Sequence, residues 1–194
     1  MQKNNTTNKI IKIVVTAMLC AVAFVLYLFE FNIAPGSLHL KLDFSDVPAL
    51  FGGILFGPLT AVVIEFIKNV LELIFRGIGS QMGFGNLMDF ILGCSYVVTF
   101  SLIYKKMAKN GKENKAIIVS ALSSTVIRVA VGFVANYLIT PLFFKYFLQT
   151  ELSSAVLWSA IGSASILNLV KGVILSIVSF PLVKSICKLV KKVI

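Results

Sequence analysis

The sequence predicts an all-α integral membrane protein, a bundle of six transmembrane helices in one domain over residues 1–194. Hydrophobic residues make up 58% of the chain and charged residues 13%, whereas a soluble domain carries about 25% charged residues. Several apolar runs reach the roughly 20 residues with which an α-helix crosses the hydrocarbon core. The basic residues gather in three places, which fall on one side of a membrane if the chain crosses it six times.

The elements follow from the apolar runs in order. Residues 1–9 are polar and rich in asparagine, which predicts a disordered tail. Six helices are predicted behind it, at residues 10–33, 47–56, 59–75, 87–104, 116–144 and 156–183. The second run is too short to cross about 30 Å alone, so we expect its start to reach back into the preceding loop.

The stretch 38–58 combines a polar loop, a short helix and a tight break. Pro48 falls in the first turn, where a helix accepts proline, and Ser45 or Asp46 is the expected N-cap. Gly57-Pro58 ends the short helix and a new apolar run begins at once. A membrane helix shortened in this way often lines a binding site, although a polar loop before an ordinary span has the same pattern.

The positions of the lysines predict the orientation, because cytoplasmic loops of membrane proteins carry an excess of positive charge. Twelve of the 18 basic residues lie before or at the start of the first helix, between the fourth and fifth, and at the end of the chain. Both termini are therefore expected in the cytoplasm. The charge marks topology, and no nucleic-acid partner is expected.

Ionisable residues also lie inside the predicted helices, where they are costly and face a bundle interior or a cavity. Glu65, Lys68, Asn69 and Glu72 share one face of the third helix, and Arg128 lies in the fifth at a similar depth to Glu65 and Lys68. They either pair as a structural network or act in coupling or ligand contact.

Asn136 in the fifth helix, and Asn168 with Lys171 in the sixth, form a second polar set. Asn168 and Lys171 are three residues apart and share a helical face. Amide and ammonium donors in an apolar wall suit a neutral, planar ligand with carbonyl and ring-nitrogen acceptors. The asparagines can instead hold neighbouring helices together.

Few residues in the chain have the chemistry of an enzyme. The single histidine, His39, lies in a predicted outer loop, and no phosphate-binding glycine motif is present. Asp43 and Asp46 have the spacing to share a cation, but capping of the next helix accounts for them better. We therefore expect a binding protein without a metal. A small membrane enzyme is the alternative from another class.

Several motifs together resemble one known family. They are LKLDFSDVPAL at 40–50, Gly52-Gly53, Phe56-Gly57-Pro58 and Glu65-Phe-Ile-Lys68-Asn69. This pattern resembles the riboflavin-specific S component, the substrate-binding membrane subunit, of energy-coupling-factor (ECF) vitamin transporters. The likeness covers nearly the whole chain.

The resemblance implies a protein that captures riboflavin from outside the cell, with the first outer loop as a lid and no prosthetic group. It assigns the flavin contacts to Asn136, Asn168 and Lys171. It extends the expected site to Leu40, Lys41, Asp43 and Gly83. FMN or another vitamin is the alternative ligand.

The resemblance also implies partners: a membrane coupling protein, two ATPase subunits and the surrounding lipids of a prokaryotic cell membrane. Ala17-Met-Leu-Cys-Ala21 matches the small-x-x-x-small motif with which the first helix of this family docks on the coupling protein. The alternative is that Ala17 and Ala21 pack against another helix of the same bundle.

Overall fold

The computed structural model describes residues 2–32, 41–77, 83–108, 113–146, 149–150 and 153–193. Over these residues the chain forms α1 (Gln2–Leu28), α2 (Asp46–Phe56), α3 (Pro58–Arg76), α4 (Phe84–Ala108), α5 (Glu113–Tyr146) and α6 (Ser154–Val193). Two short antiparallel strands of two residues each, β1 (Phe31–Asn32) and β2 (Lys41–Leu42), pair on either side of residues 33–40. The six predicted helices are confirmed. The observed helix ends differ most from the predicted ones in α1 and α6.

The start of α1 differs from the expectation of a disordered tail over 1–9, because the helix already begins at Gln2. Each residue added to an existing helix completes one more hydrogen bond, so the apolar part of α1 can extend into the polar segment. The helix ends at Leu28 rather than near residue 33, and the chain then enters β1.

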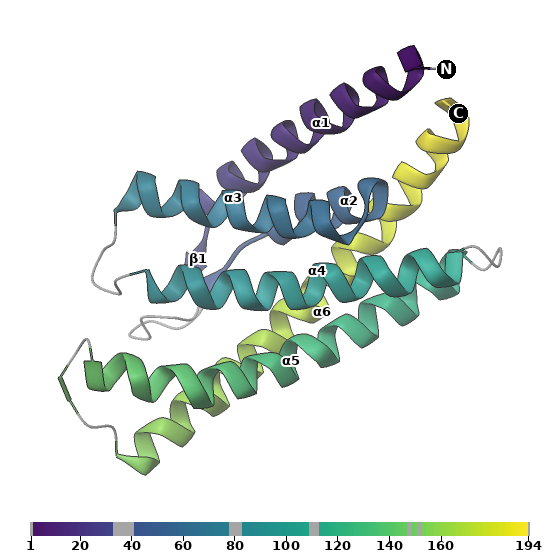
Figure 1. Cartoon of the computed structure of the whole chain (residues 1–194). Helices are drawn as coiled ribbons and strands as arrows, with labels where there is room; N and C mark the ends of the chain where they lie inside the picture. Colours follow the sequence, from purple (N-terminus) through teal and green to yellow (C-terminus); the bar gives the residue numbers. More distant parts are fainter. Residues whose placement is uncertain are drawn as a thin grey trace.

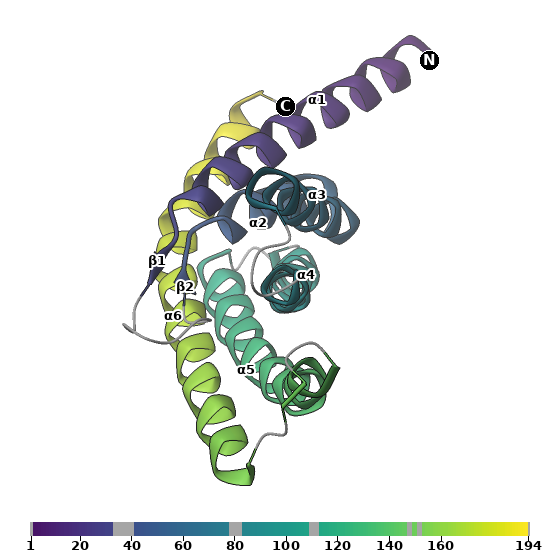
Figure 2. The ribbon, with the colours of Figure 1, turned by 90° about the vertical axis from the view of Figure 1, so that its left-hand side faces the viewer.

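The helices pack mainly beside their neighbours in sequence. α4 lies between α3 and α5, α6 packs along α5, and α1 packs on α2 and α3. In Figure 1 the start of α1, the end of α6, the end of α4 and the start of α5 lie at one end of the bundle. Figure 2 shows α6 running along one side of α2, α4 and α5. The three lysine-rich segments of the sequence therefore belong to the same end.

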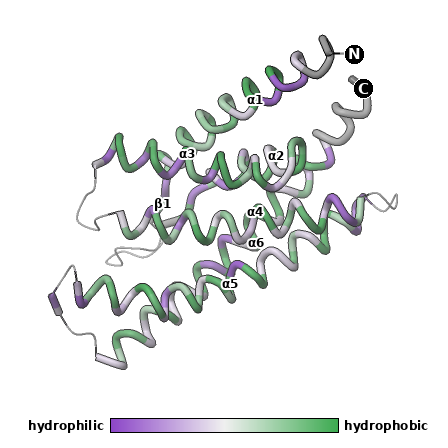
Figure 3. The backbone as a smooth tube through the Cα atoms, viewed as in Figure 1, coloured by the Kyte–Doolittle hydropathy of each residue, from purple (hydrophilic) through white to green (hydrophobic). Residues whose placement is uncertain are grey.

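The outside of the bundle is suited to lipid. α1, α4, α5 and α6 contain stretches long and apolar enough to cross a membrane, and Figure 3 shows the helices mostly in the hydrophobic colour. Large apolar side chains such as Phe66, Leu122 and Ile177 are more than half exposed. Exposure of these apolar side chains to water is unfavourable, but contact with the hydrocarbon of a membrane is not. The chain is therefore a multi-pass membrane protein.

The junction of α2 and α3 confirms the predicted break. Gly57 has φ of +103°, which an L side chain rarely adopts, and Pro58 begins α3. Ser45 is the N-cap of α2, as predicted, but its side chain makes no capping hydrogen bond, and the alternative cap, Asp46, is the first residue of the helix. Asp46 lies inside the helix and is fully buried, and its carboxylate is used for ion pairs instead.

The apolar core fills the part of the bundle nearer the chain termini. It includes Tyr104 at the end of α4, Ala116 at the start of α5 and Val183 in α6, all at most 6% exposed. Towards the other end, the interior between the helices contains charged and amide side chains.

Candidate functional site

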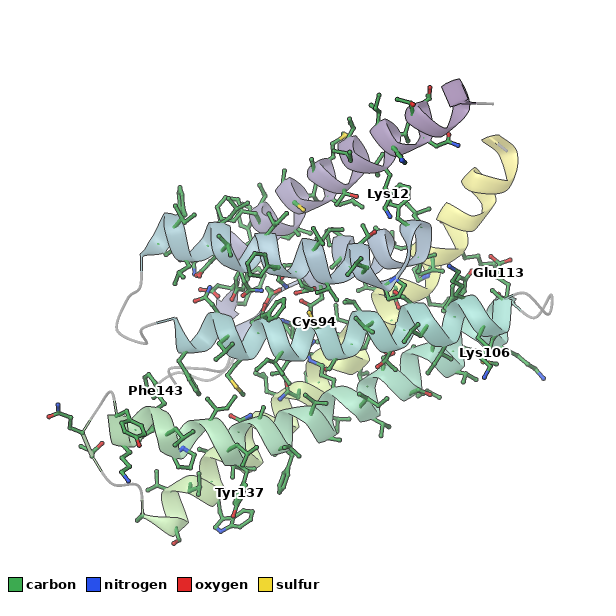
Figure 4. The ribbon with its side chains drawn as sticks, viewed as in Figure 1. Lys12, Cys94, Lys106, Glu113, Tyr137 and Phe143 are labelled. Carbon is green, nitrogen blue, oxygen red and sulfur yellow. The ribbon has the colours of Figure 1, made fainter. Side chains whose placement is uncertain are left out.

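Seven charged side chains meet inside the bundle, from α2, α3, α4, α5, α6 and the segment before α2. We call them the charged cluster: Asp43, Asp46, Glu65, Lys68, Asp89, Arg128 and Lys171. In Figure 4, sticks with oxygen and nitrogen gather between α3 and α4 near the labelled Cys94. Isolated charges in such a place would be very costly, so their stability depends on mutual pairing.

Asp46 is the centre of the charged cluster. Its Oδ1 lies 2.6 Å from Lys68 Nζ, and its Oδ2 accepts a hydrogen bond of 2.8 Å from Arg128 Nη1. Lys171 Nζ is 3.6 Å from the same Oδ2. One buried carboxylate thus joins α2 to α3, α5 and α6. The hypothesis that Glu65, Lys68 and Arg128 pair in a network agrees with these contacts, since Lys68 also lies 2.8 Å from Glu65.

Asp46, Glu65 and Asp89 also have the arrangement of a possible metal site, because their carboxylate oxygens lie within 4.8 Å of one another. Lys68 Nζ lies among these carboxylates, 2.6 Å from Asp46 and 3.2 Å from Asp89. Its ammonium group already supplies positive charge to the three acids. Asp43 and Asp46 have the spacing to share a cation. In the structure both carboxylates lie near the ammonium group of Lys171, at 2.8 Å and 3.6 Å.

Lys171 connects the charged cluster to the predicted ligand site. Its Nζ donates to Asp43 Oδ2 at 2.8 Å and to Asp89 Oδ1 at 3.2 Å. The other oxygen of Asp43 accepts from the backbone N–H of Ser45 at 2.9 Å. Both Asp43 and Lys171 were expected to contact the ligand, and the structure pairs them with each other.

Asp89 is a member of the charged cluster that was not predicted from the sequence. It lies one turn into α4, and its carboxylate lies 3.2 Å from both Lys68 and Lys171. The sequence does indicate a role for Asp89, because an acidic residue inside an apolar membrane helix is energetically costly and needs a partner.

The predicted amides lie where α5 and α6 face each other. Asn168 is only 5% exposed and lies one turn before Lys171. Asn136 is half-buried and donates from Nδ2 to the carbonyl of Gly132 at 2.8 Å. The Asn168 side chain lies against the same Gly132. Within the described part of the chain, the amide of Asn168 makes no hydrogen bond, and its nitrogen and oxygen are not completely enclosed.

The remaining predicted residues are placed only in part. Leu40 and residues 34–40 of the loop 34–46, which was expected as a lid, lie outside the described residues, and Lys41 is described only by its backbone in β2. Gly83 lies directly before α4 with φ of +76°. Ligand contacts from these residues stay predictions.

Ala17 and Ala21 are both exposed on α1, while Cys20 and Ala23 face the bundle and are at most 4% exposed. None of the other described helices covers the two alanines. The structure therefore disagrees with the alternative that they pack inside the bundle, and it leaves a flat strip at the surface.

Comparisons with known proteins agree with this architecture. A family model described as the substrate-specific component of ECF transporters matches residues 11–183. The riboflavin transporter FmnP of Bacillus subtilis is 33% identical over 172 residues, which cover 88% of each chain. The riboflavin transporter RibU of Staphylococcus aureus is 29% identical over 184 residues, 94% of this chain and 93% of that protein.

A solved S component of a bacterial ECF transporter has a similar fold, with a TM-score of 0.74 and 26% identity. The match covers 95% of this chain and 99% of that structure. The relatives are transporters, so the prediction that the chain is not an enzyme is confirmed.

Proposed function

Because the chain belongs to the family of substrate-specific components of ECF transporters, we propose that it binds riboflavin on the outer side of a prokaryotic cell membrane and delivers it through an energising module. One observation carries the choice of site. Asn168 is only 5% exposed, and its amide makes no hydrogen bond in the described part of the chain, although its polar atoms are not completely enclosed. The N–H donors and the carbonyl acceptor of this amide are therefore available to a ligand, and the carbonyl and ring-nitrogen atoms of an isoalloxazine ring can pair with them.

The surroundings of Asn168 suit a planar ring. Asn136 lies on the facing helix, and its side-chain oxygen accepts one long hydrogen bond, of 3.4 Å, from the Thr140 hydroxyl, which leaves a second lone pair for a ligand. Lys171, one turn from Asn168, adds a cationic donor to the same face of α6. We assign Asn136, Asn168 and Lys171 to the polar edge of the flavin.

The pairing of Lys171 favours riboflavin over FMN. The ammonium group of Lys171 already lies 2.8 Å from Asp43 and 3.2 Å from Asp89. Its charge is neutralised by these two carboxylates, so it gives little attraction to a phosphate, and the carboxylates repel one. FMN is the second candidate, and an affinity for FMN above that for riboflavin would reverse this choice.

The direct test is a fluorescence titration of the detergent-purified protein. Riboflavin emission should be quenched saturably at micromolar protein, and an excess of thiamine or biotin should leave the curve unchanged. An absence of saturable quenching, or competition by those vitamins, would remove riboflavin as the ligand.

The energising partners follow from the family and from the surface of α1. We assign the exposed strip at Ala17 and Ala21 to the membrane coupling protein, which would act with two ATPase subunits. Small residues one turn apart let a second helix approach closely, and close packing is the main attraction between helices in lipid.

The same proposal places both termini in the cytoplasm. The exposed lysines Lys105, Lys106, Lys115 and Lys184 lie near the end of the bundle that contains the chain termini, as expected for a cytoplasmic face. The amides of Asn136 and Asn168 lie towards the opposite end, where a ligand would enter from outside.

A further inference from the structure

Gly132 in α5 lies between the two amides of the candidate site. Its backbone carbonyl accepts the hydrogen bond of 2.8 Å from Asn136 Nδ2, one turn further along α5. Its other side faces α6, where the end of the Asn168 side chain lies over the glycine. One buried turn of α5 therefore contacts both amides.

The contact with Asn168 depends on the absence of a side chain at residue 132. A Cβ atom there would lie 2.5 Å from Asn168 Nδ2 and 3.3 Å from its Cγ. It would also approach Leu92 Cδ2 to 3.1 Å. These distances are shorter than ordinary van der Waals contacts, so any larger residue must push the Asn168 amide away.

The atoms that would have to move belong to flexible side-chain ends and not to backbone. The fold can therefore tolerate a methyl group at residue 132 by displacing the amide of Asn168. A small displacement matters for binding, because hydrogen bonds weaken steeply with poor distance and angle.

We propose that Gly132 is a positioning residue for ligand binding: the missing side chain sets the place of the Asn168 amide, and the carbonyl of Gly132 holds Asn136. This inference rests on the proposed riboflavin site. Gly132 need not touch the ligand, and it acts through the two asparagines.

The test is Gly132→Ala, with riboflavin affinity and the thermal unfolding of the ligand-free protein measured together. The loss of one buried hydrogen bond to the flavin predicts affinity about five- to a hundredfold weaker, with unfolding near that of the wild type. Gly162→Ala is the matched control, because a Cβ at Gly162 of α6 meets no atom within 4 Å. It should leave the affinity unchanged.

A double variant separates positioning from a general structural effect. With Asn168→Ala already present, the new methyl group has room, so adding Gly132→Ala should weaken binding by less than about twofold, as expected for strongly coupled neighbours. Equal factors in both backgrounds, or wild-type affinity in Gly132→Ala alone, would overturn the inference.

Two further outcomes are informative. If Gly132→Ala folds poorly, Asn168→Ala should restore folding in the double variant, and failure to do so would also overturn it. If the wild-type protein does not bind riboflavin, the proposed function fails first, and the positioning role fails with it.

Discussion

The replacement Asp46→Asn tests the charged cluster most severely, because it removes one charge and changes the shape little. Asp46 is fully buried and lies 2.6 Å from Lys68 and 2.8 Å from Arg128. The variant leaves these two buried cations with fewer carboxylates to pair with. Removal of one partner from a buried ion pair costs about 3–5 kcal/mol.

That loss has a measurable size in a thermal unfolding experiment. For a chain of 150–250 residues, 1 kcal/mol corresponds to roughly 2–4 °C, so the unfolding temperature should fall by roughly 6–20 °C. The single tryptophan, Trp158 in α6, packs against Tyr137 and provides the fluorescence signal in detergent without ligand.

Arg76→Gln is the control for Asp46→Asn. Arg76 also pairs with an acid, Glu30, but its side chain is 33% exposed, and exposed ion pairs contribute only about 0–1 kcal/mol. If Asp46→Asn unfolds within about 2 °C of the wild type, the buried charges do not hold the helices together, and the reasoning is refuted.

The other variants separate ligand contact, folding and docking. Lys171→Ala should weaken riboflavin binding and also lower the unfolding temperature, because it leaves Asp43 without the ammonium partner that lies at 2.8 Å. Asn136→Ala should weaken binding about five- to a hundredfold at an unchanged unfolding temperature; wild-type affinity would show that its amide only joins helices. Ala17→Trp or Ala21→Trp should bind riboflavin normally but fail to co-purify with the coupling protein and fail to support uptake in cells. Loss of riboflavin binding in these two variants would contradict a role of the strip in docking alone.

The sequence was sufficient for the helices, because their apolar runs and the Gly57-Pro58 break are local signals. It also placed Glu65, Lys68 and Asn69 on one buried face of α3, where the structure has them at most 6% exposed. Helical spacing determines such a face without knowledge of the neighbours.

The partners of the buried charges were beyond local reasoning. Lys171 meets Asp43 across 128 positions of sequence, and that contact depends on how α6 is rotated against the segment before α2. Asp46 was expected as a cap because it follows a polar loop. Its carboxylate instead pairs with Lys68 and Arg128 inside the bundle, and these partners depend on how distant helices pack. The close approach of Asn168 to Gly132 also appears only once α5 and α6 are packed.

We propose that riboflavin binds between α5 and α6 at the amide of Asn168, which makes no hydrogen bond in the described part of the chain. The most direct measurement is a calorimetric titration of riboflavin into the purified wild-type protein and, under the same conditions, into Asn168→Ala. We predict one riboflavin per chain for the wild type and affinity about five- to a hundredfold weaker for the variant. No binding by the wild type, or equal affinity in a folded variant, would contradict the account.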